Sequence, residues 1–80
     1  MRTLSCTLTF QDGVKLTAKA AAKTEQETVR VDYSGDTLRI KPLPEKATLG
    51  FLEWYLQGVA ANKGAEIEVK VDGDYDQPEK

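Results

Sequence analysis

The sequence predicts an α+β fold, in which an antiparallel sheet is packed on one face by a single amphipathic helix. Short segments alternate apolar with polar residues, glycine-containing turns separate them, and one longer segment repeats its apolar residues with the helical period. The predicted order is ββββαβ: two hairpins, the helix and a C-terminal strand. A chain of 80 residues is expected to form one domain with a small core.

Residues 3–20 predict the first hairpin. Inward-facing apolar residues alternate with threonine, serine and lysine on both sides of the loop Gln11–Asp12–Gly13. A three-residue loop with Gly13 in the left-handed region brings each inward residue opposite another. The expected pairs are Phe10 with Val14, Leu8 with Leu16, Cys6 with Ala18, and Leu4 with Ala20.

The segment Leu16–Gln26 leaves a second interpretation open, because "AKAAAK" has a high helix propensity. A helix here changes the order to βαββαβ. Such a helix would offer mainly alanine to the core and bury little apolar surface, so the strand is favoured, with fraying or a bulge after Ala20.

The segment "TVRVDYSGDTLRIKPL" predicts a second hairpin around Gly35–Asp36. A type II′ turn with glycine first sets the inward residues of its two strands opposite each other. Those residues are Val29, Val31 and Tyr33 on one side and Leu38 and Ile40 on the other. Pro42 and Pro44 then end the second strand, because proline cannot donate to a ladder.

The segment "PEKATLGFLEWYLQGVAANKG" predicts the helix, with Pro44 in its first turn and Gly64 as its C-cap. Its apolar stripe consists of Leu49, Leu52, Tyr55, Leu56 and Val59, with Phe51 at the edge. The last predicted strand is "AEIEVKV". We therefore expect a single domain over residues 1–71, followed by an acidic, frayed tail over residues 72–80.

The sequence argues against an enzyme. It contains no histidine to serve as a base, and its one cysteine, Cys6, has the inward phase of a buried, unreactive thiol. No cofactor or metal is expected, because metal-ligand spacing and a glycine-rich phosphate loop are both missing. A lone thiol, and no apolar run long enough to span a bilayer, predict a cytoplasmic protein.

Two segments, "VRVDYSGDTLRIK" and "KGAEIEVKVDGD", resemble the hairpin and late strand of the histidine-containing phosphocarrier family. In this chain Lys15 stands near the position at which that family carries its phosphorylated histidine. Because the chain has no histidine, the resemblance does not extend to phosphocarrier activity, and the chain is not assigned to that family.

The back of the predicted helix nominates a binding surface, made of Ala47, Gly50, Trp54, Gly58 and Ala61. A solvent-exposed helix face normally carries charged residues, whereas glycine within a helix costs about 1 kcal/mol relative to alanine. Tryptophan is enriched among interface hot spots. We therefore predict a non-catalytic interaction module, an accessory subunit or inhibitor, that binds a protein partner or a second copy of itself. Cover of this face by the tail or a loop is the alternative.

The outer face of the predicted sheet nominates a second surface, made of Lys15, Lys19, Arg30, Arg39 and Lys41. These cations could hold a phosphate backbone, so nucleic-acid binding is the alternative function. Sheet-based single-strand binders also stack bases on aromatic residues, whereas Phe10 and Tyr33 are predicted to point inward. A solvated face is therefore favoured over a nucleic-acid site.

Overall fold

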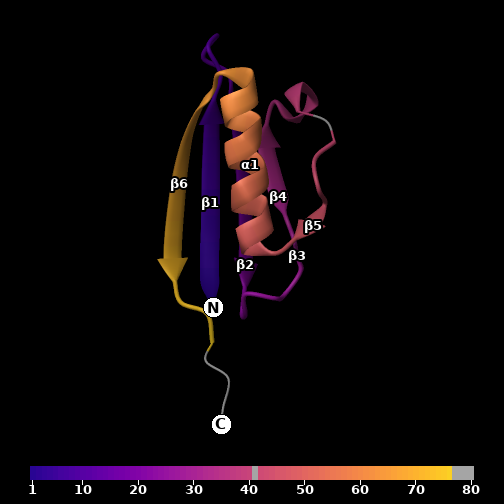
Figure 1. Cartoon of the computed structure of the whole chain (residues 1–80), viewed down its shortest axis with the longest axis vertical. Coiled ribbons are helices and arrows are strands. Elements are labelled where there is room, and N and C mark those ends of the chain that lie inside the picture. The colour runs from indigo at the N-terminus through magenta and orange to yellow at the C-terminus, as the bar shows by residue number, and fades with distance from the viewer. Residues whose placement is uncertain (41, 77–80) are drawn as a thin grey trace.

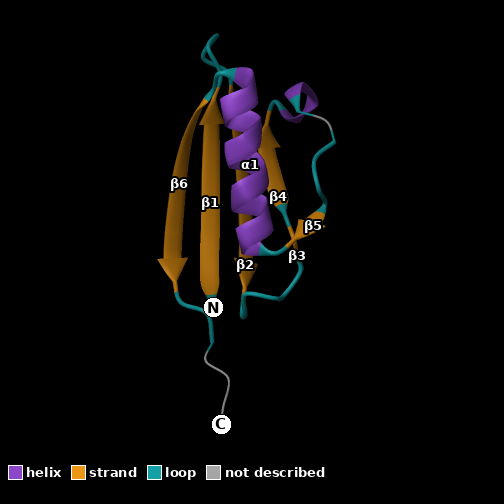
Figure 2. Cartoon of the chain, viewed as in Figure 1, coloured by secondary structure: helices purple, strands orange, loops and turns teal. Residues whose placement is uncertain are grey.

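The computed structural model describes residues 1–40 and 42–76 and has the predicted α+β fold. Four antiparallel strands form the main sheet in the order β4-β2-β1-β6, with bounds Asp32–Gly35, Lys15–Ala22, Arg2–Thr9 and Glu66–Gly73. One helix, α1 (Leu49–Lys63), lies along one face of this sheet, in front of β2 in Figure 1. Strands β3 (Val29–Arg30) and β5 (Lys46–Ala47) form a separate two-stranded sheet beside it (Figure 2).

The first hairpin has the predicted register. Leu8 pairs with Leu16, Cys6 with Ala18 and Leu4 with Ala20, and the Phe10 N–H donates to the Val14 carbonyl at 2.9 Å. The expected fraying after Ala20 is wrong. Strand β2 continues to Ala22, which is buried and paired with Arg2, so the helical interpretation of residues 16–22 is also excluded.

The second hairpin does not form. Strand β4 pairs with β2, where Lys19 lies opposite Asp32 and Leu16 opposite Gly35. The chain then turns through a short 3₁₀ helix, η1 (Thr37–Arg39), capped by the Asp36 carboxylate, which accepts from the Leu38 N–H at 3.2 Å. All four residues of β4 pair with β2, and the chain beyond Gly35 turns away from the sheet into η1.

The helix begins later than predicted. Residues 46–47 belong to β5, and the Thr48 hydroxyl accepts from the Phe51 N–H at 3.1 Å, so that Thr48 is the N-cap in place of the Pro44 turn. The C-cap is confirmed at Gly64, which has φ +67° and donates its N–H to the Ala60 carbonyl. The helix contacts β1, β6 and β2, and the side chains that it buries are Leu49, Leu52, Leu56 and Ala60.

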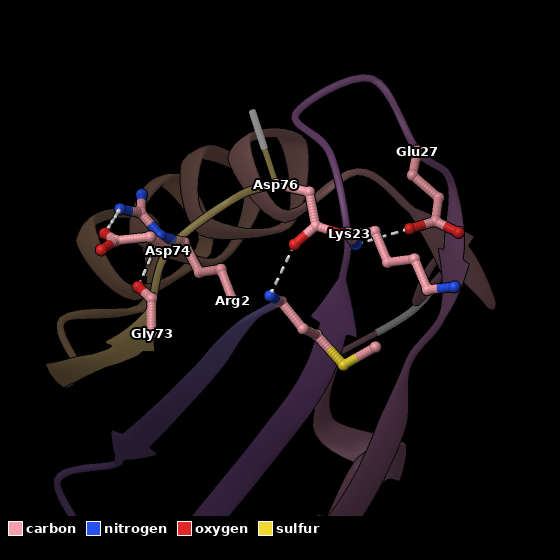
Figure 3. Close-up of polar contacts among 7 residues, drawn as sticks. Arg2, Lys23, Glu27, Gly73, Asp74 and Asp76 are labelled. Carbon is pink, nitrogen blue, oxygen red and sulfur yellow. Dashed lines mark hydrogen bonds and ion pairs between the residues drawn. The ribbon is translucent and has the colours of Figure 1, made fainter. Parts of the chain in front are cut away.

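The C-terminal segment stays paired with the start of the chain beyond residue 71. Strand β6 extends past Val71 to Gly73, and the next residues contact the N-terminus (Figure 3). The Arg2 guanidinium donates to the Gly73 carbonyl and the Asp74 carboxylate, both at 3.3 Å, and the Asp76 N–H donates to the Lys23 carbonyl at 2.7 Å. Strand β6 thus ends at Gly73, beyond the predicted domain boundary at Val71. Residues 77–80 of the predicted tail lie outside the described residues.

Candidate interaction surface on the helix

Two aromatic side chains lie next to each other on the side of α1 that faces away from the sheet. Trp54 is 69% exposed and Phe51 is 45% exposed, and their ring centroids are 5.9 Å apart. Leu52 and Leu56, on the opposite side of the same helix, are fully buried. The helical period separates Trp54 from the core stripe as the sequence predicted. Phe51, which was predicted at the edge of the apolar stripe, lies instead beside Trp54.

Gly50 and Gly58 flank Trp54 along the same helix face. A Cβ atom added at either glycine would meet no atom of the domain within 4 Å, apart from chain neighbours and the backbone of the helix itself. Neither glycine has a positive φ. Packing and backbone conformation within the described domain therefore require glycine at neither position, although each glycine costs about 1 kcal/mol in a helix.

Of the other two residues predicted for this surface, Ala61 lies on it and Ala47 does not. Ala61 is exposed on the same side of α1 as Trp54. Ala47 is not part of the surface, because it lies in β5 and is only 6% exposed within the core. The prediction assumed that the helix already includes the residues before Thr48, whereas the chain forms a β-strand there.

Residues 1–40 and 42–76 leave the outer side of α1 around Trp54 exposed. Within that part of the chain, no loop or tail residue covers Trp54, which keeps most of its surface. The described end of the tail, through Asp76, runs instead along Met1 and Lys23. Trp54 is thus an exposed residue and not a core residue of the described domain.

A cavity of about 580 Å³ adjoins the aromatic pair, between η1 and the C-terminal half of α1. Its lining residues are Leu38, Arg39, Ile40, Trp54, Tyr55, Gly58, Val59, Asn62 and Lys63. The Tyr55 hydroxyl donates to the Pro42 carbonyl and so holds the segment after η1 beside the helix. Leu38, which is 74% exposed here, was predicted to face inward in a hairpin that does not form, so the sequence did not reveal this cavity.

Arg39 belongs to this helix side of the molecule and not to the outer face of the sheet. Its guanidinium contacts the carboxylates of Asp12 and Asp36, the latter at 3.0 Å, and lies 5.2 Å from the centroid of the Phe10 ring. The Val14 N–H and the Arg39 guanidinium hold the pKa of Asp12 below its ordinary value. Arg39 is therefore engaged by two acids in its own domain.

The remaining predicted cations are spread over several elements. Lys15 and Lys19 are both exposed on β2, and Lys19 lies opposite Asp32 of β4. Arg30 belongs to the two-stranded sheet, on β3, and Lys41 lies outside the described residues. The described structure brings Lys15 and Lys19 to one strand but does not add Arg39 to them.

Cys6 is fully buried beneath the helix, as predicted. Burial, together with the negative charge of Glu53, raises the pKa of its thiol to about 11, so the nucleophilic thiolate is scarce near neutral pH. Within the described part of the chain, no three metal-ligating side chains gather into a group. Across the same residues, no helix combines the length and apolar character needed to cross a membrane.

Comparison of the chain with protein-family models, with curated proteins and with solved structures finds no significant match.

Proposed function

We propose that this protein is a small, non-catalytic, cytoplasmic interaction module that binds a protein partner through the Trp54 face, defined as Gly50, Phe51, Trp54, Gly58 and Ala61. An accessory subunit and an inhibitor are both modules of this kind. The observation that carries the proposal is a 69% exposed tryptophan between two helix glycines. A Cβ added at either glycine would meet no atom within 4 Å, apart from chain neighbours and the backbone of the helix.

The energetics of the free domain support this proposal. An exposed tryptophan leaves a large apolar area in water, and each glycine lowers helix stability by about 1 kcal/mol relative to alanine. None of the five residues of the Trp54 face is charged, although charged residues ordinarily occupy the outer side of a helix. These costs are offset if a partner covers the tryptophan and packs closely against the glycines.

The test compares the wild-type chain with the variant Trp54→Ala, both immobilised and exposed in parallel to a cell extract and to the purified chain itself. Lys15→Ala, on the opposite face of the molecule, is the matched control. The proposal predicts binding that the wild-type and Lys15→Ala chains share and that the Trp54→Ala chain loses. Binding that is identical for all three chains would overturn it.

Nucleic-acid binding is the weaker candidate, because Arg39 is already paired with Asp12 and Asp36. Titration of labelled single-stranded DNA at low salt tests it: a loss of binding in Lys19→Glu would support this function against the one proposed here.

A further inference from the structure

We infer that the partner on the Trp54 face is a second copy of this chain, with the two α1 helices packed antiparallel about a two-fold axis. This inference rests on the proposed function and specifies its partner. It comes from the spacing and the order of the side chains on the face.

Four exposed residues of α1 follow the spacing of a helix–helix seam. Phe51, Trp54, Gly58 and Ala61 are separated by three, four and three positions, which is the a/d pattern of a coiled coil. A residue spacing of this kind keeps all four side chains on the line where two helices meet at a small crossing angle. The seam lies opposite the buried stripe of Leu49, Leu52, Leu56 and Ala60.

The order of sizes along the seam selects the orientation of the second helix. The two large residues, Phe51 and Trp54, occupy the N-terminal half, and the two small ones, Gly58 and Ala61, occupy the C-terminal half. If the two-fold axis crosses α1 at the level of Leu56, Trp54 meets Gly58 of the partner subunit. In the same arrangement Phe51 meets Ala61 of the partner subunit, so every layer joins a large to a small residue.

A parallel pair does not have this property. It would bring Trp54 against Trp54 of the partner subunit, and Gly58 against Gly58 of the partner subunit. One end of the interface would then be overfilled and the other would contain a void, and both defects are costly in a packed interface. An unrelated partner could fit the face, but the seam of this chain is complementary to itself in the antiparallel orientation.

The cavity beside η1 supports the same arrangement. Gly58 forms part of its lining, and the position of a Cβ at Gly58 is open. The indole of the partner subunit's Trp54 arrives at this point, where Leu38 is 74% exposed and available to cover it. The exposed leucine and the two exposed aromatic residues would thus become buried together.

The expected dimer is reversible. A helix of 15 residues is about 22 Å long, so one helix–helix seam with Leu38 at its side gives an interface near the lower end of the size range of specific interfaces. Because the seam carries no charge, association should depend little on salt concentration.

The first experiment is sedimentation of the purified chain over a range of concentrations, with the emission of its single tryptophan recorded in parallel. We expect a concentration-dependent dimer and a matching blue shift of the Trp54 emission. Gly58→Ala should weaken dimerisation by more than about tenfold. Lys15→Ala, on the outer face of the sheet and away from the seam, is the control and should leave dimerisation unchanged.

The second experiment exchanges the sizes in the central layer. Trp54→Ala alone leaves two small residues opposite each other, and Gly58→Trp alone sets two indoles against each other, so each variant should be monomeric. An equimolar mixture should form a heterodimer, because each layer again joins a large to a small residue. Circular dichroism checks that both variants fold; if Gly58→Trp does not, the comparison of Gly58→Ala with Lys15→Ala decides.

The outcomes separate this inference from the proposed function. A wild-type chain that stays monomeric at every concentration overturns the inference, while Trp54-dependent binding to another protein would still support the proposed function. A dimer that Trp54→Ala and Gly58→Ala leave unchanged uses another surface and also overturns the inference. If the wild-type chain shows neither self-association nor Trp54-dependent binding to another protein, both the inference and the proposed function are overturned.

Discussion

The ring centroids of Phe51 and Trp54 lie 5.9 Å apart on the side of α1 that faces away from the sheet. Three of the five exposed large hydrophobic side chains of the described residues, Leu38, Phe51 and Trp54, are on this side of the molecule. The aromatic pair is therefore the centre of an exposed apolar surface. Substitutions on this surface should affect the free energy of unfolding less than substitutions in the core.

Trp54→Ala should change the free energy of unfolding of the monomer by less than about 1 kcal/mol, because an exposed side chain loses little burial on truncation. Leu52→Ala, on the buried side of the same helix, should cost about 2–5 kcal/mol. Urea denaturation at low protein concentration measures both. Equal losses for the two variants would mean that Trp54 is covered in the folded monomer.

Gly50→Ala and Gly58→Ala should each raise the free energy of unfolding by up to about 1 kcal/mol under the same conditions. The added methyl group meets no atom within 4 Å at either position, so the gain in helix propensity is not opposed by a clash. Thermal and urea unfolding both report the change. A destabilised variant would show that the glycine is required inside the domain.

Gly35→Ala should be much more damaging than Gly13→Ala. Both glycines have a positive φ, +93° and +87°, where an alanine is strained by about 1–2 kcal/mol. At Gly35 the new Cβ would also lie 2.3 Å from the Lys15 carbonyl oxygen, whereas at Gly13 it meets no atom within 4 Å. The difference between their urea midpoints measures the contact of β4 with β2; equal midpoints would contradict the pairing of these strands.

The Cys6 thiol should make the protein less stable in alkali. Its pKa is raised from 9.0 to about 11 in the folded state, so the folded chain keeps a proton that the unfolded chain loses between these values. The stability contribution is complete below pH 9.0 and declines as the pH rises, by at most about 1.4 kcal/mol per pH unit. The slope of the free energy of unfolding against pH is compared with that of Cys6→Ala. Identical slopes would show that Cys6 is not the group responsible.

The elements that follow from local rules were predictable. The register of β1 with β2 depends on a three-residue loop and on alternation within the same 20 residues, and the end of α1 depends on Gly64. The segment from Val29 to Ala47 was not predictable in this way. Its strands pair with β2 and with each other across long loops, and alternation alone does not distinguish these partners from a local hairpin.

The residues of the candidate surface were likewise predictable only where they depend on local rules. Gly50, Trp54, Gly58 and Ala61 could be identified because the helical period sets them opposite the buried leucines. Ala47 was included wrongly, since the start of the helix depends on the Thr48 cap and on the pairing of β5. Leu38 was missed because its exposure depends on where β4 finds its partner.

The sequence by itself determined the α+β class, the first hairpin and the uncharged face around Trp54, because alternation, helical period and turn residues act over short distances along the chain. Only the tertiary structure decided the partner of β4, the pairing of Arg39 with Asp12 and the cavity beside Gly58. Each of these requires segments that are far apart in the sequence to meet, and the choice among competing partners depends on the packing of the whole domain.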